Sequence, residues 1–384
     1  MKIYLVENIN PFNEIMGGIG VYLQNLIHNL KKRNDDIYFI GVSNKKSNHV
    51  NQIGIKKSLF IPIKYTRQGK ISHPEYVFRL LIKYYKLNIS SKGVIHAQRP
   101  DVLFPFALFN KNKLVCSLHG RQDELIYFKR GKVYGRVYEF LERYSLTKVD
   151  VLVAVDNLTY DYYITKYPFV KQKIVVIPIG VDFTKFKPLD KQALRAKYGY
   201  KNDDKILINV GRLSKEKNII FLLTVMKRLN IIYENVKLIL VGSGKEESTL
   251  KKYIIDNNID NVVFMGSMNS EKIIELLNIS DVFAFCSNIE GSPTTIKEAL
   301  ACNIPVVSFD VGDVASIIDK FQGCHIVNEE IEDFCNAIQT VFRDKLDVNY
   351  REKMIKYNNE ILFDQLYNIY KTINKESRIK LYPN

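Results

Sequence analysis

Short runs of apolar residues alternate along the chain with segments in which apolar side chains recur at helical spacing. The first run, 3–6, is followed by apolar positions at three- and four-residue intervals over 21–30. The same order recurs at 205–210 and 219–229. Repeated units of a strand and an amphipathic helix are typical of parallel sheets covered by helices. The pattern predicts an α/β protein whose chain starts a second domain near residue 205.

Further apolar runs are predicted to be strands, at residues 93–95, 114–118, 151–155, 173–177, 236–241, 262–264, 282–285 and 305–309. We expect two doubly wound domains facing each other across a cleft, because ligands of such sheets bind beyond the carboxyl ends of the strands. Pro178 and Gly180 interrupt the pattern and predict a boundary between domains of residues 1–180 and 181–364. A last helix, 365–384, is expected to pack back on the first domain.

Length and composition change this picture little. A chain of 384 residues with 46% hydrophobic and 25% charged residues is long enough for two globular domains. Its longest stretch without a charged residue, 15–30, contains three glycines, so no membrane-spanning helix is predicted. The apolar run after Met1 is too short for a signal peptide, and we expect a cytoplasmic protein. The five cysteines form no CxxC pair and are expected to be reduced core residues.

The net positive charge lies entirely in the first half of the chain. Of the net charge of +15, residues 1–180 account for all, with 28 Lys and Arg against 13 Asp and Glu, while the remainder has 28 of each. A uniformly lysine-rich composition would spread the excess evenly, so the asymmetry indicates that the first domain meets an anionic partner. A module that binds an anionic polymer is one alternative, whereas nucleic acid is not expected because recognised RNA-binding motifs are absent.

The densest group of candidate site residues follows the predicted strand 282–285. A loop that opens a helix presents unpaired N–H groups and the positive end of the helix dipole, and both bind phosphate. Glu290 lies just before this helix, where a carboxylate suits the hydroxyls of a sugar. Glu298 follows in the first turns of the helix. Its alternative role is to cap the helix and not to bind a ligand, because Thr295 to Glu298 has capping-box spacing. The loop and helix start consist of Gly291, Ser292, Pro293, Thr294 and Thr295.

A second group, Gly211, Arg212 and Lys217, follows the strand 205–210. The guanidinium fork and the ammonium suit a diphosphate, and the alternative is a solvated charged loop. Residues 242–245 do not complete a P-loop, and 18–20 lack the third glycine of a dinucleotide fingerprint, which excludes both motifs. No Asp-x-Asp occurs, so no metal ion is expected beside the diphosphate.

The first domain contributes a glycine pair and a histidine. Gly17 and Gly18 allow the backbone to approach a ligand closely. His119, followed by Gly120, ends the strand 114–118 at the sheet edge where ligands bind. The alternative is a purely structural histidine.

Together these motifs resemble the retaining glycosyltransferases of family 4, which have the GT-B fold of two Rossmann-like domains. Motifs occur in the family's order at 17–20, 94–100, 118–120, 176–182, 211–217, 241–244 and 290–306. The resemblance implies transfer of a sugar from a nucleotide diphosphate donor to a glycan or lipid-linked acceptor, with retention of anomeric configuration and without metal or cofactor. It leaves the donor base, the sugar and the acceptor open.

The resemblance also implies a role for individual residues. Glu290 would contact the donor sugar, Glu298 the ribose, and Arg212 with Lys217 the diphosphate. Gly18 would offer a backbone N–H to the phosphate, and His119 would lie beside the reacting carbon. Catalysis is therefore expected from His119, Glu290, Arg212 and Lys217.

The sequence departs from the family pattern at four positions. Asn303 and Asp313 replace glycines, Ser316 replaces a glutamate and Asp156 replaces a serine. Asp313 makes the loop near the donor more acidic. An alternative within enzymes is a GT-B nucleotide-sugar epimerase, which would need acid and base side chains that the sequence does not reveal.

The basic segment 121–148 also contains many apolar and aromatic residues and predicts an amphipathic surface helix. Such a helix would be drawn to anionic lipid headgroups. We expect a peripheral protein on the inner face of the plasma membrane that extends a lipid-linked or anionic glycan of a cell-surface polysaccharide or glycolipid. The alternative is an ordinary helix with its apolar face in the core.

Overall fold

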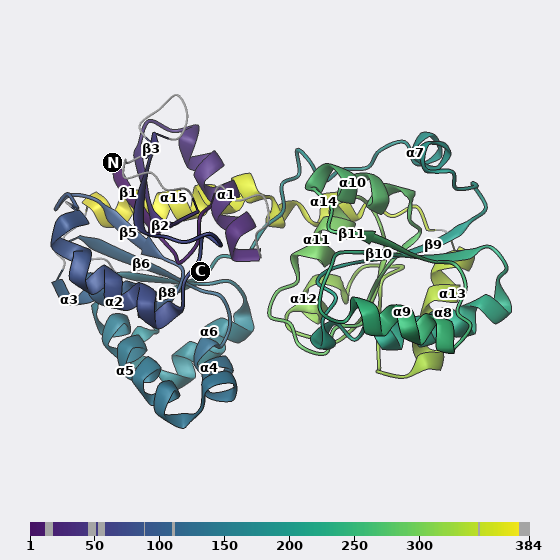
Figure 1. The fold of residues 1–384 in the computed structure, drawn as a ribbon. Helices are drawn as coiled ribbons and strands as arrows, with labels where there is room; N and C mark the ends of the chain where they lie inside the picture. The colour runs from purple at the N-terminus through teal and green to yellow at the C-terminus, as the bar shows by residue number, and fades with distance from the viewer. Residues whose placement is uncertain are drawn as a thin grey trace. The chain divides into compact units, whose positions relative to one another are not determined.

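The computed structural model describes residues 1–11, 18–44, 51–52, 58–87, 89–109, 112–344 and 346–375. The chain forms two compact units: one contains residues 1–179 and the C-terminal segment from Glu360, and the other contains 180–359 (Figure 1). The chain thus leaves the first unit one residue before the predicted boundary. It returns five residues earlier than predicted, and residues 376–384 lie outside the described part.

The first unit is built on one sheet with strand order β3-β4-β2-β1-β5-β6-β7-β8. All neighbours pair in parallel except β3, which is antiparallel to β4. The strands are β1 (Lys2–Val6), β2 (Asp36–Ser43), β3 (Asn51–Gln52), β4 (Ser58–Tyr65), β5 (Val94–Ala97), β6 (Lys113–Leu118), β7 (Val151–Ala154) and β8 (Ile174–Val176).

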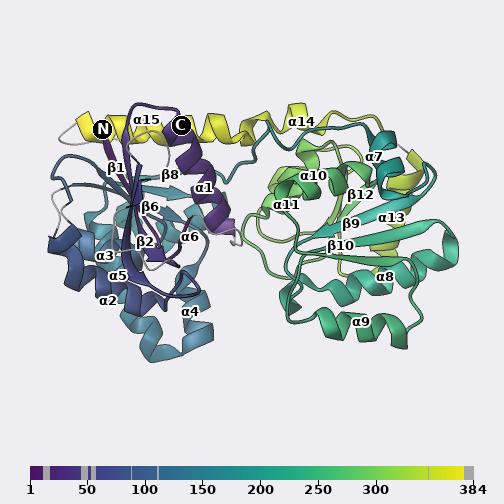
Figure 2. The same ribbon diagram turned by 45° about the horizontal axis from the view of Figure 1, so that its top comes forward.

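Helices cover both faces of this sheet. They are α1 (Gly18–Lys31), α2 (His73–Lys83), η1 (Tyr84–Leu87), α3 (Pro100–Phe109), α4 (Gln122–Arg130), α5 (Lys132–Lys148), α6 (Asn157–Lys166), η2 (Pro168–Val170) and α15 (Asn359–Lys375). Leu26 of α1 and Leu366 of α15 share a core cluster with Leu5 of β1, and Figure 2 shows the two helices on that face. Leu80 of α2, Phe106 of α3 and the other side chains of the opposite cluster cover the second face.

The predicted single helix over the basic segment is wrong. Gly131 has φ +83 and ends α4 before α5 begins, so two helices replace the expected one. A left-handed residue cannot continue a right-handed helix, and glycine adopts this conformation readily. The predicted last helix, 365–384, begins earlier, at Asn359.

The second unit has a wholly parallel sheet with order β11-β10-β9-β12-β13-β14. Its strands are β9 (Lys205–Val210), β10 (Val236–Val241), β11 (Val262–Gly266), β12 (Val282–Phe285), β13 (Val306–Phe309) and β14 (His325–Val327). Its helices are α7 (Lys191–Tyr198), η3 (Lys215–Lys217), α8 (Ile219–Ile232), α9 (Glu247–Asp256), α10 (Ser270–Ile279), α11 (Thr294–Ala301), α12 (Val314–Ile318), α13 (Ile331–Asp344), α14 (Tyr350–Lys353) and η4 (Ile355–Tyr357).

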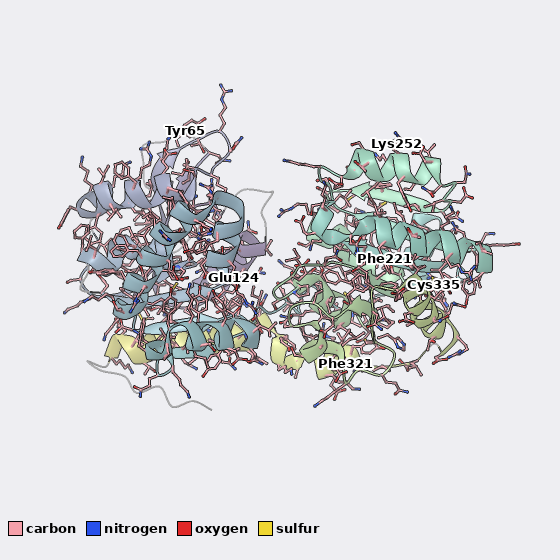
Figure 3. The ribbon with its side chains drawn as sticks, turned by 90° about the horizontal axis from the view of Figure 1, so that it is seen from below. Tyr65, Glu124, Phe221, Lys252, Phe321 and Cys335 are labelled. Carbon is pink, nitrogen blue, oxygen red and sulfur yellow. The ribbon has the colours of Figure 1, made fainter. Side chains whose placement is uncertain are left out.

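Two core clusters lie on the two faces of the second sheet. On one face Phe221 of α8 contacts the ring of Phe334, which neighbours Cys335 on α13 (Figure 3). On the other face α10, α11 and α12 pack on the sheet through Leu277, Ile296 and Ile317. All five cysteines are free, and all but the partly exposed Cys324 are buried.

Both sheets reverse their strand order once, between β1 and β5 in the first unit and between β9 and β12 in the second. The predicted class, two doubly wound α/β domains, is confirmed. Ligands of such sheets bind where the order reverses, beyond the carboxyl ends of the strands. In the described part of the chain, no helix has both the length and the apolar character needed to cross a membrane.

Candidate functional site

The reversal point of the second sheet opens between β9 and β12. The two strands pair only as far as Ile208 and Phe283, and beyond this point the Asn209 side chain donates to the Ala284 carbonyl at 2.8 Å. This buried amide satisfies a carbonyl that the diverging strands leave unpaired. The chain segments that follow β9 and β12 carry Arg212 and Glu290 and therefore leave the same edge of the sheet.

The segment after β9 is held against the loop that follows β10. The Gly211 N–H donates to the Val241 carbonyl at 2.9 Å, and the Leu213 N–H donates to the Ser243 carbonyl at 3.1 Å. Gly242 has φ +135, and a Cβ there would lie 1.8 Å from the Gly211 carbonyl oxygen. Only glycine fits this close approach. The backbone that presents Arg212 is therefore fixed by its neighbours.

Lys217 and Glu290 meet across the reversal point. Their side chains form a partly buried ion pair, and the Lys217 Cε lies 3.7 Å from where a Cβ on Gly211 would stand. The Asn288 N–H also donates to the Glu216 carbonyl at 2.9 Å, so the two loops are joined along the backbone. Three residues predicted from two separate motifs, Gly211, Lys217 and Glu290, are thus brought together.

Arg212 is exposed and forms no salt bridge with any residue that the structure describes. Arg212 lies on the segment that carries Lys217. An exposed guanidinium without a salt bridge is suited to bind an anion from solution.

Helix α11 starts at the same edge. Thr294 and Thr295 are its first two residues, and Pro293 precedes them without a side-chain cap. The first N–H groups of a helix have no partner inside it, so this end attracts an anion. Gly291, exposed, and Ser292 connect it to Glu290.

Glu298 does not cap this helix, so the capping-box interpretation is wrong. The helix begins at Thr294 rather than after Thr295, which makes Glu298 its fifth residue. Burial raises the pKa of Glu298 to about 7. A carboxyl that is partly withdrawn from water and does not serve as a cap is available to bind hydroxyl groups.

In the first unit His119 directly follows β6, as predicted. Its Nε2 lies 3.0 Å from Gln98 Oε1, which identifies Nε2 as the protonated nitrogen when the oxygen is the acceptor. Burial, assisted by the nearby Arg99 charge, lowers the pKa of His119 to about 4. The imidazole is therefore neutral at pH 7. Its Nδ1 has no hydrogen-bond partner among the described residues.

Helix α1 brings its start close to this histidine. Gly18 is the first residue of α1, and a Cβ built on it would meet no atom of the described residues within 4 Å. Tyr22, one turn later, contacts the His119 ring edge-on at 5.5 Å between centroids. Gly17, the other predicted glycine, lies outside the described residues.

Sequence reasoning missed the polar cluster that supports His119. The Arg99 guanidinium forms two hydrogen bonds with Asp101, at 2.9 and 3.0 Å, and a third with Gln122 Oε1 at 3.1 Å. Gln122 in turn donates to the His119 carbonyl at 2.9 Å. Glu7 follows β1, and burial raises its pKa to about 7. The available signal was the position of Glu7 and Arg99 just after strand-like runs.

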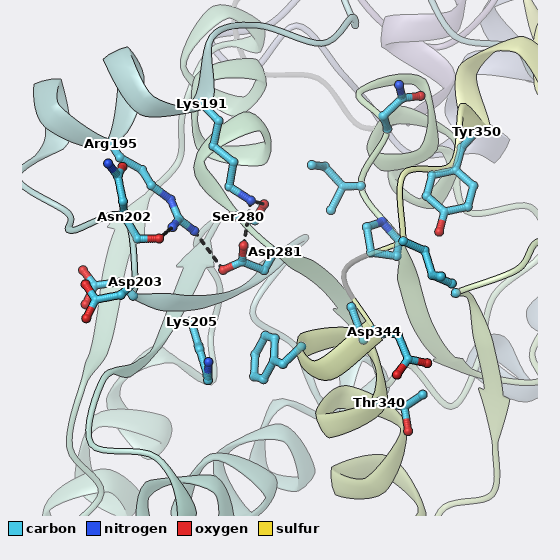
Figure 4. A pocket seen from close by; sticks show the side chains of 18 of the residues that line it. Lys191, Arg195, Asn202, Asp203, Lys205, Ser280, Asp281, Thr340, Asp344 and Tyr350 are labelled. Atoms are coloured by element: carbon cyan, nitrogen blue, oxygen red, sulfur yellow. Dashed lines mark hydrogen bonds and ion pairs between the residues drawn. The ribbon is translucent and has the colours of Figure 1, made fainter.

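A cavity of about 390 Å³ in the second unit lies away from these residues. It is lined at the amino-terminal ends of β9, β12 and β13, for example by Lys205, Asp281 and Pro305. Figure 4 shows that Asp281 forms salt bridges with Lys191, at 2.6 Å, and with Arg195, at 2.8 Å. These pairs tie α7 to the sheet, and none of the predicted site residues lines the cavity.

The chain matches two families over successive halves. The family described as Glycosyltransferase Family 4 matches residues 16–185, and the family described as Glycosyl transferases group 1 matches residues 190–361. The UDP-Gal:alpha-D-GlcNAc-diphosphoundecaprenol alpha-1,3-galactosyltransferase of Escherichia coli is 30% identical over 292 residues, which cover 72% of this chain and 74% of that protein.

Two further likenesses agree with this match. An uncharacterized glycosyltransferase of Methanocaldococcus jannaschii is 27% identical over 250 residues, 61% of this chain, and the match spans only 60% of that relative's own length. The solved structure of sucrose-phosphate synthase from Thermosynechococcus elongatus has a TM-score of 0.82 at 19% identity, with 97% of this chain and 98% of that one covered. The chain therefore belongs to the family 4 glycosyltransferases and has their GT-B fold.

Proposed function

We propose that this glycosyltransferase moves a sugar from a nucleotide diphosphate donor to a glycan or lipid-linked acceptor, with retention of anomeric configuration, in the synthesis of a cell-surface polysaccharide or glycolipid. The proposal rests on one observation: Arg212 and Lys217 follow β9 and the start of α11 follows β12, at one reversal point of a doubly wound sheet, where Lys217 pairs with Glu290. Two cationic side chains and a helix N-terminus together suit a diphosphate.

The chemistry follows from the leaving group. The bond between the sugar and the diphosphate breaks as charge grows on the departing phosphate oxygen. Arg212, Lys217 and the N–H groups of Thr294 and Thr295 would stabilise that charge. A new bond forms between the sugar carbon and the acceptor oxygen on the same face, and the departing phosphate oxygen takes the acceptor's proton. This route needs no protein base, which accords with the neutral, weakly basic His119.

The polar groups around the sugar have separate tasks in this proposal. Glu290, held by Lys217, would accept hydrogen bonds from sugar hydroxyls. Glu298 would do the same for the ribose. His119 would contact the sugar near the reacting carbon through Nδ1, which would accept a hydrogen bond from a sugar hydroxyl. We further propose that the reaction requires no metal ion, with positive side chains and the helix end in its place.

The acceptor is proposed to be lipid-linked or anionic because of the surface of the first unit. On α5 the residues Val133, Val137 and Phe140 are exposed, although they are apolar and share one stripe of the helix. The buried positions of α5 include Gly135, Tyr138 and Glu142 instead. Leu146 and Ser145 are buried as well, so α5 has apolar side chains on its buried face and a second apolar stripe that is exposed.

A second exposed apolar stripe lies on α2 and η1. Phe78 and Ile82 of α2 and Tyr85 of η1 recur at helical spacing and are also exposed. Helix α3 contacts both α2 and α5, and Figure 1 shows the three helices on one face of the sheet. Exposed cations accompany the two stripes, Arg136 and Arg143 on α5 and Lys86 on η1. Apolar stripes among cations suit an anionic lipid surface. The E. coli relative acts, by its name, on a diphosphoundecaprenol-linked sugar.

The proposed activity is tested by incubating the protein with a panel of nucleotide sugars and lipid-linked acceptors and measuring released nucleotide. The anomeric configuration of the product is then determined by NMR. Retention and activity that persists in EDTA are expected. An inverted product, or activity that is lost in EDTA and restored by magnesium, would contradict the proposed chemistry. Epimerised nucleotide sugar without transfer would favour the epimerase alternative.

A further inference from the structure

Lys297 is a charged residue in an unusual place. Its side chain is 0% exposed, on the fourth residue of α11. A buried ammonium is tolerated only where it is hydrogen-bonded and paired with opposite charge. Its Nζ donates to Ser292 Oγ at 2.7 Å and lies 3.6 Å from Asp313 Oδ2. None of the roles assigned above uses Lys297.

Ser292 completes a closed arrangement of three side chains. Its hydroxyl accepts from Lys297 and donates to Asp313 Oδ2 at 2.7 Å. Ser292 lies in the loop after β12, two residues from Glu290, and Asp313 lies in the loop after β13. We name Lys297, Ser292 and Asp313 the loop clamp, because they fasten these two loops to α11.

The backbone reinforces the loop clamp. The Asp313 N–H donates to the Gly291 carbonyl at 2.9 Å. Gly312 has φ +58, and a Cβ there would lie 2.1 Å from that same carbonyl oxygen. The two loops therefore touch so closely that a side chain at 312 would push Gly291, the neighbour of Glu290, out of place.

The loop clamp also reaches the segment by which the chain leaves the second unit. The Lys297 Nζ lies 4.9 Å from the centroid of the Tyr357 ring, a cation–π distance. The Tyr357 carbonyl accepts from the Val181 N–H at 2.8 Å, and the Asn359 N–H donates to the Val181 carbonyl at 2.9 Å. The ammonium thus has a serine, a carboxylate and an aromatic ring around it.

We propose that Lys297, Ser292 and Asp313 are positioning residues that hold the loop from Glu290 to Thr294 in its donor-binding conformation. The inference rests on the proposed function, because it assumes that this loop receives a nucleotide diphosphate. A loop ordered in advance loses less conformational entropy when the ligand binds. Asp313 supplies the anion that the buried Lys297 requires.

The variant Lys297→Met removes the charge and keeps most of the side-chain volume. We expect at least a tenfold rise in the Kd of the nucleoside diphosphate, measured by titration calorimetry with UDP, GDP and ADP. We also expect faster hydrogen exchange of the amides from Glu290 to Ile296. The matched control is Arg195→Met, which removes another buried cation of the same unit from its partner Asp281. It should lower the melting temperature and leave the Kd unchanged.

Two further variants keep the test decisive if Lys297→Met folds poorly. In Lys297→Met/Asp313→Asn no buried charge is left without its partner, so the melting temperature should recover while the Kd stays at least tenfold higher. Ser292→Ala removes the bridging hydroxyl alone and should raise the Kd in the same direction. Recovery of both stability and affinity in the double variant would show a purely structural ion pair and overturn the inference.

Failure of the proposed function would look different. If the wild-type protein bound none of the three nucleoside diphosphates, the donor assignment itself would fall. If the wild type bound one of them and the Lys297→Met and Ser292→Ala variants bound it equally well, with unchanged exchange from Glu290 to Ile296, only the loop clamp would be contradicted.

Discussion

Lys217 and Glu290 form an ion pair although 73 positions separate them in the chain. The pair joins the segment after β9 to the loop after β12, at the point where the strand order of the second sheet reverses. The cation proposed to bind the diphosphate is thus paired with the carboxylate proposed to bind the sugar. Each of the two side chains orients the other before a donor arrives.

Removing either cation should weaken the stabilisation of the departing diphosphate. We expect Arg212→Ala and Lys217→Ala each to lower kcat by roughly 10²-fold, the scale for one lost transition-state charge contact. Steady-state rates with the donor identified by the panel provide the measurement. Lys215→Ala is the control, because Lys215 is exposed on the same short helix, η3. Equal losses in all three variants would indicate a general charge effect rather than two specific contacts.

Glu290→Gln should damage catalysis without unfolding the protein. The amide keeps the shape of the side chain but loses the charge that pairs with Lys217 and the second strong acceptor for sugar hydroxyls. We expect kcat to fall by about 10²-fold and the melting temperature to change little, since partly exposed ion pairs contribute about 1 kcal/mol or less. Glu216→Gln, on η3 next to Lys217, serves as the control. Wild-type rates in Glu290→Gln would refute the sugar-binding role.

Glu298 makes the stability of the protein depend on pH. Because its folded pKa is raised to about 7, the folded state keeps the proton to higher pH than the unfolded chain does. The ionised Glu298 side chain therefore lowers the free energy of unfolding above that pKa. This penalty disappears as the pH falls to the ordinary pKa of a glutamate. Glu298→Gln should be more stable than wild type at pH 8, on the order of 2 kcal/mol, and equal to it near pH 4.

Melting temperatures of the two proteins at pH 4.5 and pH 8 measure this difference. Glu234→Gln, an exposed site in the same unit, is the control and should show no pH-dependent gain. Added nucleotide should raise the melting temperature of Glu298→Gln less than that of wild type, because a ribose contact is lost. A destabilised Glu298→Gln at pH 8 would instead favour the capping role that the position of Thr294 argues against.

His119→Gln should separate binding from turnover. The histidine belongs to the first unit, whereas the proposed diphosphate contacts belong to the second. We expect kcat to fall by at least tenfold while the Kd of the nucleoside diphosphate stays within twofold of wild type. Titration calorimetry and initial rates on the same samples provide both values. His28→Gln, at an exposed position of α1, is the control. A changed Kd with an unchanged kcat would instead indicate that His119 acts in nucleotide binding and not in turnover.

Much of the fold was readable because apolar runs and helical spacing alternate so regularly. The strands 205–210, 236–241 and 282–285 were predicted with their observed bounds. The strands β2, β3, β4 and β14 were missed. Pro62 lies within β4, and a proline in an apolar run argues against a strand. The strand β14 has only three residues, too few for a clear pattern. Parallel pairing with β2 and β13 supplies what these local sequences lack.

The candidate site could be predicted where glycine or a charged residue follows a predicted strand, as at Gly211 and Glu290. Side-chain partnerships were not readable, because they depend on which loops the topology places side by side. Lys297 shows this limit: a lysine in an amphipathic helix normally faces water, and only its packing against Ser292 and Asp313 reveals a buried charge. The start of α11 at Thr294 likewise decided the role of Glu298.

The exposed stripe of α5 should bind anionic membranes. Val137→Asp and Phe140→Asp place charge where apolar side chains would enter the headgroup region, and Arg136→Glu with Arg143→Glu reverses an attraction of about 1 kcal/mol per cation near the surface. We expect wild-type protein to co-sediment with vesicles containing phosphatidylglycerol more than with neutral ones, and each set of substitutions to reduce this binding at least fivefold. Ile255→Asp, an equally exposed apolar position in the second unit, is the control and should bind as wild type does. High salt should weaken binding, because exposed charges are screened.

Two outcomes would contradict this prediction. The protein could partition equally onto neutral and anionic vesicles, or the substitutions could leave vesicle binding unchanged. Either result would mean that the stripe does not face a membrane and that the acceptor is soluble.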